Sequence, residues 1–589
     1  MAYSYAIPLA WYIQLKWVEK PQWKWAWLQC VHLMVLLLTH AYLGAIAAAF
    51  AGLIAGLHVL SNWKSKTRLT IRLLQIATAS VLPLIAYIAL LKTSDNHPFR
   101  TDQPYGFWDN ISTWNAALLP SHGIFGVARK EFGWGLNAWE GWGFWGTGTW
   151  LVLLIFIAEY LRRSNPRLQT INWAIVLVAF SSITLYAIGA GEPFLSGKSQ
   201  WLKEWPLFMQ FRAIGRFVWP AAWAMPVLAA FGCFHLATAP RLKWLPYLFV
   251  GMFALDAFWM QQKCKEEMQT QQNCFASIDA ELQAVVNAAK KSEAIAIHPV
   301  PWFQMGSESV GREGSVRAHR QTLAASFHTG LPTTAAHLTR TSISESRLLA
   351  EWMAHPGLTK NLLNQFEPSD YEKVVVLYAC DDASTWSDDD HLLWQRANLT
   401  DDAAIRTLTV GQWLKENEAL NVWVQANKGD SDVATNGLNE EECPFALEGS
   451  GAKRGIGNEY ILIETLTPDS TWLGKTIEAS CWFFHDTPHA GRDALQFEWV
   501  MEAKWPDDSG QWVRQTPVAS SGDHSKGWTR ASLRYRLEEL PTALHCFAVG
   551  FGESPDTVWA DAFRAQFVPE ESVVYKSSPF TQGTEENSP

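Results

Sequence analysis

The sequence predicts a multi-domain protein that consists of a polytopic α-helical membrane domain of seven or eight spans, a small α/β domain and an antiparallel β-sandwich. The charge changes sign along the chain: residues 1–260 hold 20 Lys and Arg against 10 Asp and Glu, whereas residues 261–589 hold 27 against 47. The first part also contains 20 of the 33 Trp residues. This composition excludes a single soluble globule, a disordered chain and a nucleic-acid-binding protein, which would carry a basic exposed domain.

Apolar runs long enough to cross a hydrocarbon layer of about 30 Å recur through residues 1–260. Five single runs are residues 69–91, 142–160, 171–190, 217–237 and 244–260. Residues 25–60 are too long for one span, so we expect two spans joined by a tight turn at residues 40–44. Residues 3–15 form a shorter stretch that would make an eighth span.

Lys and Arg gather in every second predicted loop. They lie in residues 16–24, 64–68, 162–167 and 241–243. Because short basic loops stay in the cytoplasm, the acidic part after residue 261 is expected on the opposite side. We therefore expect a multi-pass protein of a bacterial inner (plasma) membrane that contacts membrane lipids and has its C-terminal half in the periplasm or outside the cell.

Four segments of the first part resemble a known family. NAWEGWGFWGTGTWLVLL (residues 137–154) resembles an EG-x-x-YLG-x-G element, and LFMQFRAIGRFVWP (207–220) resembles F-R-A-x-GR-F-x-WP. LLTHAYLG (37–44) resembles an HxYL turn, and LDAF (255–258) an Asp near the end of the last span. Together they resemble bacterial polytopic membrane proteins with a GT-C-type glycosyltransferase-like core. The resemblance implies transfer of a sugar from a lipid-linked donor, such as a polyprenyl-phosphate sugar, on the outer face.

The sequence departs from that family in one respect. GT-C enzymes carry a catalytic acidic motif in the first outer loop, whereas this sequence matches the pattern only from several spans onward. It therefore predicts either half of a split enzyme or a scaffold without catalysis. In the second case the protein would be an assembly subunit of a larger membrane complex, and its sandwich would bind partner subunits.

Arg212 and Arg216 are four residues apart and so share one face of a helix. Their planar guanidinium groups suit a phosphate or pyrophosphate, because each can bind two oxygens. A salt bridge to Glu204, or contact with lipid phosphates, is the alternative.

Asp109, Asn110 and Glu140 are polar residues of the predicted outer loop. Glycosyl transfer needs a base for the acceptor hydroxyl or a carboxylate that holds a divalent cation, so Glu140 and Asp109 are catalytic candidates and Asn110 a substrate-binding candidate. Glu140 can instead cap the following helix. The acidic residues 381–390 can likewise bind Ca²⁺ or form a solvated loop.

Three further residues complete the substrate-binding candidates. His40 can bind a phosphate, carry a proton or satisfy a backbone carbonyl, and Tyr42 lies in the same turn. Asp256 lies inside the last span, where an ionisable side chain is costly and indicates function or pairing with an Arg. P-loop, GxGxxG, HExxH, CxxC and GxSxG patterns are absent from the sequence, so no nucleotide cofactor or structural zinc is predicted.

The acidic half is predicted to hold two domains. Over residues 261–435, strands 294–300, 374–380 and 421–427 are expected to alternate with helices 276–290, 344–356 and 410–420, as in a small α/β domain. We also expect a disulfide between Cys264 and Cys274.

Residues 436–570 alternate apolar and polar side chains with a period of two, which is typical of strands with one buried face. The segments are residues 457–466, 475–486, 494–505, 510–517, 528–538, 543–552 and 557–568. Their order is similar to jelly-roll carbohydrate-binding-like domains. Trp505, Trp512 and Trp528 can stack on sugars or pack in the core. Residues 571–589 are expected to be disordered.

Overall fold

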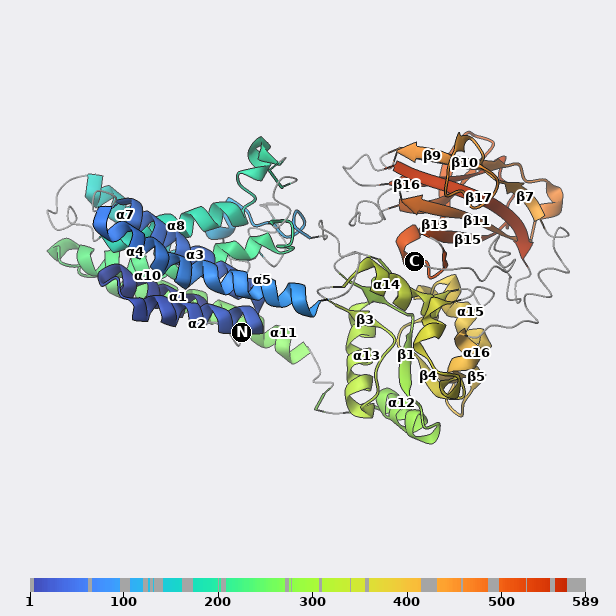
Figure 1. Cartoon of the computed structure of the whole chain (residues 1–589), viewed down its shortest axis with the longest axis horizontal. Helices are drawn as coiled ribbons and strands as arrows, with labels where there is room; N and C mark the ends of the chain where they lie inside the picture. Colours follow the sequence, from blue (N-terminus) through green and yellow to red (C-terminus); the bar gives the residue numbers. More distant parts are fainter. Residues whose placement is uncertain are drawn as a thin grey trace. The chain divides into compact units, whose positions relative to one another are not determined.

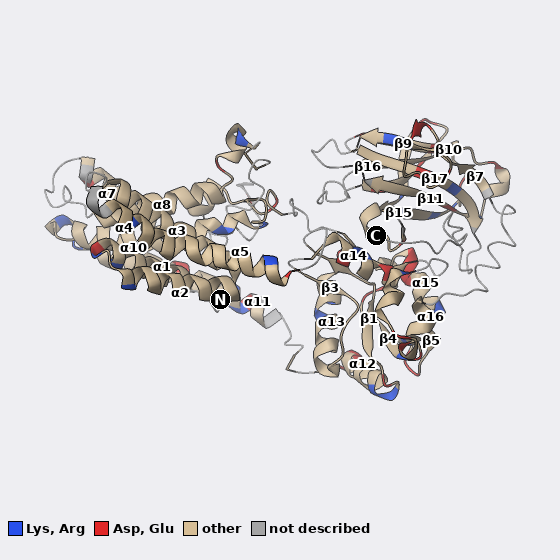
Figure 2. Ribbon diagram, in the orientation of Figure 1, with Lys and Arg blue, Asp and Glu red and all other residues tan. Residues whose placement is uncertain are grey.

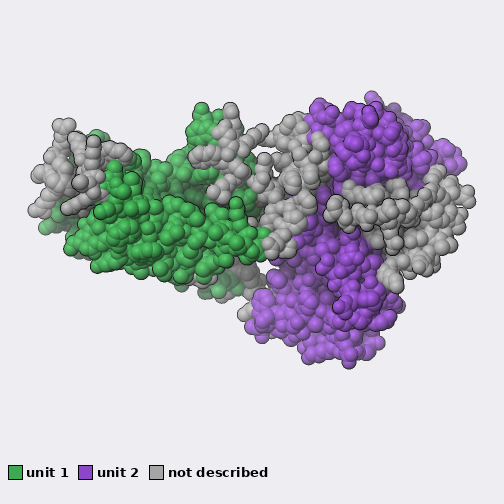
Figure 3. Space-filling model, viewed as in Figure 1, with its two compact units in different colours: residues 1–96, 106–272 green, residues 97–105, 273–589 purple. Residues whose placement is uncertain are grey.

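The computed structural model describes residues 5–61, 66–95, 106–119, 126–127, 131, 141–161, 173–199, 201–202, 208–270, 275–276, 278–306, 310–338, 341–354, 360–414, 432–456, 459–485, 497–525, 527–550 and 557–568. The chain forms two compact units, residues 1–96 with 106–272 and residues 97–105 with 273–589 (Figure 3).

The first unit is helical, and helices cover all eight apolar runs of the sequence (Figure 1). They are α1 (Ala6–Glu19), α2 (Trp23–Thr39), α3 (Ala41–Ser61), α4 (Lys66–Ile76), η1 (Ala77–Val81), α5 (Leu82–Ser94), α7 (Thr147–Leu161), α8 (Trp173–Gly189), η7 (Ile214–Val218), α10 (Trp219–Leu236) and α11 (Leu245–Thr270). Charged side chains are sparse along them (Figure 2).

Three of these helical stretches are long and apolar enough to cross a membrane: Ala41–Ser61, Leu69–Ser94 and Ile214–Leu236. Thr147–Glu159 and Trp173–Gly189 are shorter apolar helices. The helical unit is therefore of a kind that associates with membranes. The expectation of seven or eight crossings, and the side on which the acidic half lies, stay predictions.

The turn expected at residues 40–44 is a break of a single residue. His40 ends α2 with a non-helical backbone (φ −155°, ψ 85°), and α3 begins at the next residue. Gly44 lies one turn into α3, where an added Cβ would meet Leu37 Cγ at 2.7 Å and Leu37 N at 2.8 Å. The two helices can therefore turn back on each other after His40 only because residue 44 has no side chain.

The α/β part of the second unit contains a sheet in the order β1-β4-β6-β5. Its strands are β1 (Ala296–Val300), β4 (Val374–Ala379), β5 (Asn398–Leu399) and β6 (Ile405–Thr409). β1 and β4 are the first two predicted strands and pair in parallel, whereas β6 pairs antiparallel with β4. The third strand is therefore β6, which the sequence pattern did not predict; the strand expected at residues 421–427 lies outside the described residues.

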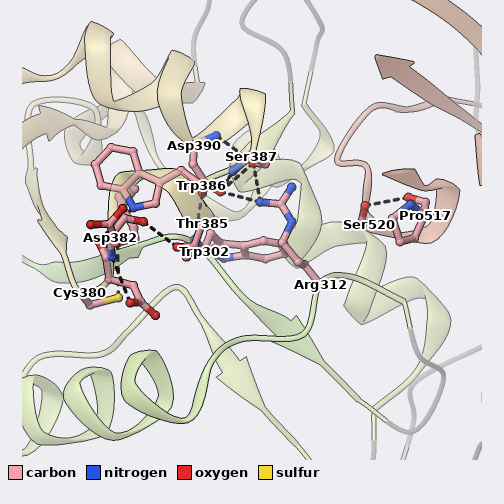
Figure 4. A network of polar contacts seen from close by, with 12 residues as sticks. Trp302, Arg312, Cys380, Asp382, Thr385, Trp386, Ser387, Asp390, Pro517 and Ser520 are labelled. Carbon is pink, nitrogen blue, oxygen red and sulfur yellow. Dashed lines mark hydrogen bonds and ion pairs between the residues drawn. The ribbon is translucent and has the colours of Figure 1, made fainter. Parts of the chain in front are cut away.

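Short helices pack around this sheet and confirm the alternation of strands and helices. They are α12 (Ala280–Lys291), α13 (Val316–Thr329), α14 (Ile343–Ala350), η9 (Glu351–Met353), α15 (Asp388–Arg396) and α16 (Val410–Leu414). The acidic segment 381–390 mostly builds local structure (Figure 4). Asp382 accepts a hydrogen bond from Ser384 N, and Asp390 accepts from Trp302 N and pairs with Arg312 at 2.6 Å.

The C-terminal part is an antiparallel β-sandwich. One sheet has the order β14-β15-β11-β17-β9-β8, with β7 also paired to β17, and the other has the order β10-β16-β12-β13. The strands are β7 (Asp432–Asn436), β8 (Glu441–Glu442), β9 (Gly451–Ile456), β10 (Tyr460–Leu466), β11 (Thr476–His485), β12 (Phe497–Lys504), β13 (Gly510–Pro517), β14 (His524–Ser525), β15 (Trp528–Arg536), β16 (Ala543–Gly550) and β17 (Thr557–Val568). All seven segments predicted from period-two alternation are strands.

Two details differ from or extend the sequence expectations. Trp528 is buried, and Trp505 packs against the core of the sandwich, so of the three Trp residues proposed for sugar stacking only Trp512 is exposed. The cysteines within the described residues are unbridged, and Cys274, the expected partner of Cys264, lies outside them.

Gly44→Ala should destabilise the helical unit by about 1–3 kcal/mol, because the new Cβ overlaps Leu37. Gly56→Ala is the matched control, since an added Cβ at this position of the same helix meets nothing within 4 Å. We expect thermal unfolding of the detergent-solubilised chain to show a lower Tm for Gly44→Ala alone. Equal Tm values for the two variants would contradict the close packing of α2 on α3.

Candidate functional site

The helical unit brings four of the predicted substrate-binding residues together. Asn110 Nδ2 donates hydrogen bonds to Gly106 O and Arg212 O, each at 3.0 Å. Tyr42 Oη accepts from Ala213 N at 2.5 Å, next to Arg212. The start of α3 and two segments distant in sequence therefore meet at residues 212–213.

Arg216 joins the same cluster through aromatic rings. Its guanidinium carbon lies 5.1 Å from the ring centre of Tyr42 and 5.7 Å from that of Trp219. Gly215 permits this approach, because its N–H donates to Asn110 O at 2.8 Å and an added Cβ would lie 2.5 Å from that oxygen. The structure thus explains both residues of the Gly-Arg pair in FRAIGRF: Gly215 allows close backbone contact, and Arg216 stacks on aromatic rings.

The other predicted residues lie in different surroundings. Asp256 accepts hydrogen bonds from Thr147 N at 2.8 Å and Thr147 Oγ1 at 2.9 Å, and so caps the start of α7. His40 Nδ1 lies 3.4 Å from Leu43 N at the helix break. Asp109 is exposed, and Glu140 lies outside the described residues. The roles assigned to all of these residues in substrate binding or catalysis stay predictions.

The part of the chain that the structure describes contains no preformed metal site. There, no three His, Cys, Asp or Glu side chains come close enough together to hold an ion. This includes the described acidic segment 381–390, whose Asp382 and Asp390 serve as helix caps.

The β-sandwich carries a second group of functional side chains on the outer face of its four-stranded sheet. Alternate residues of β10, β12 and β16 fill the core between the sheets, so the residues between them point outward. Three aromatic residues and one leucine lie together on this outer face. We name them the aromatic row: Tyr460, Leu462, Phe547 and Trp512. Phe547 is the centre of the row, with ring centres 5.5 Å from Tyr460 and 5.8 Å from Trp512.

The aromatic row lines an open groove with a volume of about 320 Å³. Tyr460, Leu462 and Trp512 are 69%, 46% and 37% exposed, which is high for large apolar side chains. Glu502 and His545 complete the lining. Glu502 pairs with Lys504 at 3.3 Å, and His545 Nδ1 lies 3.3 Å from Thr465 Oγ1. An apolar floor with a few polar groups is the usual composition of a small-molecule site.

Glu498 lies on the same outer face, opposite Val549 of β16. Burial raises the pKa of its carboxyl group above the ordinary value, and Oε2 has no hydrogen-bond donor among the described residues. A carboxylate in this position can accept a hydrogen bond from a ligand hydroxyl.

Sequence reasoning singled out Trp512 in this groove but missed Tyr460, Phe547, Glu502 and His545. Part of their signal was present in the alternation itself: the outward positions of YILIE and HCFAV include Tyr460, Leu462 and Phe547, although outward positions of a strand are usually polar. Which of these residues meet is decided by pairing between strands that are distant in sequence.

The fold is thus that of a helical protein with membrane-length segments, followed by an α/β domain and a β-sandwich. Residues 4–261 match a family described as a domain of unknown function, DUF6311, which covers less than half of the chain. No curated protein matches this chain. The family description names no activity, so the GT-C resemblance remains a prediction.

Solved structures similar to the C-terminal quarter of this chain include carbohydrate-binding modules of family 22. The CBM22-1 xylan-binding domain of Paenibacillus barcinonensis Xyn10C is 13% identical, with 24% of this chain and 83% of that chain covered and a TM-score of 0.16. The C-terminal family 22 module of Clostridium thermocellum Xyn10B is 11% identical, with 25% and 86% covered and a TM-score of 0.17. At this level the similarity carries no argument about ligands.

Glu498→Gln should stabilise the protein at pH 7 and leave its stability unchanged near pH 4. The pKa of this carboxyl is raised in the folded state, so the stability that its protonated form provides is lost as pH rises through the folded pKa. The neutral amide avoids that loss, and we expect a Tm higher by about 1–3 °C at pH 7.

The matched control is Glu539→Gln, at an exposed position of the same sandwich, which should unfold like the unmodified protein at both pH values. Thermal unfolding at the two pH values measures both effects. A lower Tm for Glu498→Gln at pH 7 would mean that the ionised carboxylate is stabilising, against this account.

Proposed function

We propose that this protein is a membrane-associated glycan-binding protein. The helical unit associates with the membrane, and the groove on the outer face of the four-stranded sheet binds a neutral oligosaccharide. The observation that carries the proposal is the aromatic row, in which the exposed rings of Tyr460 and Trp512 line the groove together with the carboxylate of Glu502. Glu498 lies on the same face of the sheet, outside the groove lining.

The chemistry of the groove selects for sugars in two ways. Flat aromatic rings cover the C–H faces of a sugar without requiring it to lose hydroxyl hydration, and Tyr460 and Trp512 lie on either side of Phe547. Carboxylates accept hydrogen bonds from hydroxyl groups, because they have only lone pairs to offer. The same carboxylates repel acidic glycans, which is why we assign a neutral chain to this groove.

A linear chain fits this arrangement better than a single sugar unit. The row runs across β10, β16, β12 and β13, and strands lie about 4.8 Å apart, so its length covers more than one ring of a glycan. Chains whose rings have equatorial substituents present flat faces, so cellohexaose and xylohexaose are suitable probes and maltohexaose is a comparison of different linkage.

Trp512→Ala should weaken binding of the favoured hexaose by about tenfold, which corresponds to the loss of roughly 1.4 kcal/mol of stacking. Leu473→Ala is the control, because Leu473 is an exposed apolar residue of the same sandwich outside the groove. Isothermal titration calorimetry of the detergent-solubilised full chain measures both affinities.

Two results would reject the glycan-binding proposal. One is the absence of binding for all three hexaoses up to about 10 mM. The other is an unchanged affinity in Trp512→Ala, which would place the ligand elsewhere.

A second candidate function is the recognition of a lipid-linked sugar phosphate by the helical unit, as the GT-C resemblance implies. The observation that favours it is the meeting of Arg212 and Arg216 with Tyr42 and Asn110. A guanidinium that stacks through its flat face binds phosphate oxygens through its N–H edge, so ring stacking and phosphate binding are compatible at Arg216. If the protein is instead a membrane scaffold without catalysis, these four residues serve only to pack the helical unit.

Arg216→Gln should abolish binding of undecaprenyl phosphate if this cluster recognises phosphate, and Arg216→Lys should retain part of it, because Lys keeps the charge but loses the planar fork. Lys198→Gln is the control, since Lys198 is an exposed cation over the Trp201 ring at 6.0 Å. Binding to detergent-solubilised protein is compared with undecaprenol, which lacks the phosphate. Equal binding of the two lipids would favour the scaffold.

A further inference from the structure

A second cleft, of about 280 Å³, lies inside the second unit between the α/β part and the sandwich. Its lining combines side chains from α14, η9, the segment after η9 and the edge of the larger sheet. Its polar lining residues are Ser344, Arg347, Glu351, Asn361 and His524, and the indole of Trp528 also lines it.

The walls of this cleft are fixed by close backbone contacts. Gly522 packs so tightly that an added Cβ would lie 2.2 Å from Ala350 O and 2.6 Å from Ala354 N. Nearby, Gly311 N donates to Ala519 O at 2.8 Å, and Val310, Ile343 and Ala519 form a buried apolar cluster. These contacts join the two walls of the cleft.

Arg347 is a partly buried cation that forms no ion pair in the described part of the chain. Burial lowers the pKa of its guanidinium, no carboxylate of the described residues pairs with it, and its Nε is buried without a hydrogen-bond acceptor. The deeply buried guanidinium of Arg530, in the sandwich, has counter-charges instead: it lies 3.5 Å from Glu478, 3.7 Å from Asp523 and 2.7 Å from Ser480 Oγ. An unpaired buried charge is costly, so an anion supplied from outside would stabilise Arg347.

His524 presents a second polar atom at the same place. Its Nδ1 lies 3.0 Å from Thr529 Oγ1, whereas its Nε2 is buried with no partner among the described residues. Burial and the charge of Arg347 lower the pKa of this imidazole to about 3, so it is neutral at physiological pH. In the tautomer whose Nδ1 accepts from Thr529, Nε2–H is a hydrogen-bond donor for a ligand.

Glu351 limits the charge that the cleft can accept. Its carboxylate accepts hydrogen bonds from Asn361 Nδ2 at 2.9 Å and Leu362 N at 2.8 Å. It therefore stays fixed in the lining, where it repels a ligand with several negative charges and accepts hydrogen bonds from hydroxyl groups.

We propose that this cleft is a binding site for a small hydroxylated carboxylic acid of the sugar-acid class, whose carboxylate pairs with Arg347 and accepts a hydrogen bond from His524. The guanidinium fork matches the two oxygens of one carboxylate, and the hydroxyl groups of the ligand meet Glu351 and Ser344. This site is separate from the aromatic row and does not depend on the glycan-binding proposal.

The test is calorimetric titration of the detergent-solubilised full chain with glucuronate, glucose and inorganic phosphate. Glucuronate should bind, and Arg347→Gln should weaken it by at least about tenfold. Arg347→Lys should retain part of the affinity. Arg317→Gln, which removes an exposed guanidinium paired with Glu281 on α12, should bind glucuronate like the unmodified protein.

A second readout keeps the test independent of a folding defect. Without ligand, Arg347→Gln should unfold at the same or a higher temperature than the unmodified protein, because it removes an unpaired buried charge. Glucuronate should raise the Tm of the unmodified protein but not that of Arg347→Gln. Hexaose binding at the aromatic row should be unchanged in this variant, which separates the two sites.

Three results would overturn the proposal: no glucuronate binding to the unmodified protein at about 20 mM, equal affinities for glucose and glucuronate, or unchanged glucuronate affinity in Arg347→Gln. Binding of inorganic phosphate without glucuronate would also overturn it, because the site would then select another anion.

Discussion

One buried hydrogen bond sets how the two sheets of the sandwich face each other. Trp499 of β12 is fully buried, and its indole N–H donates to Ala479 O of β11, in the opposite sheet, at 3.1 Å. An indole this large in the core must satisfy its N–H, so its place between the sheets is fixed by both volume and polarity. Since side chains alternate along a strand, an inward Trp499 directs Glu498 and Val500 outward. Which side chains of β12 reach the outer face of the sheet therefore follows from a residue that faces the core.

Much of the fold could be predicted from local pattern. Every strand expected in the sandwich was found, because strands with one face toward the core alternate in burial, as β10 does along most of its length and β12 does except at Val500. The helix break at His40 was predictable from the length of the apolar run. β6 was missed because IRTLT is short and carries an Arg and two Thr residues, so its apolar signal is weak. Its place beside β4 follows from tertiary pairing.

The candidate sites were less predictable than the fold, because their members meet through contacts that no local pattern encodes. The side chain of Tyr42 accepts a hydrogen bond from Ala213 N, and the side chain of Asn110 donates one to Arg212 O. Asp256 was singled out as an ionisable residue in an apolar helix, and the structure explains it as a cap for α7. Arg347 lies in an ordinary amphipathic helix, and only the contact of that helix with the sandwich makes its charge unusual.

The contact of Gly522 with Ala350 and Ala354 also has a mechanical consequence. Because an added Cβ would overlap the Ala350 carbonyl and the Ala354 amide, any side chain at residue 522 would force this loop away from Ala350 and Ala354. The junction between the two parts of the second unit therefore depends on a residue that has no side chain.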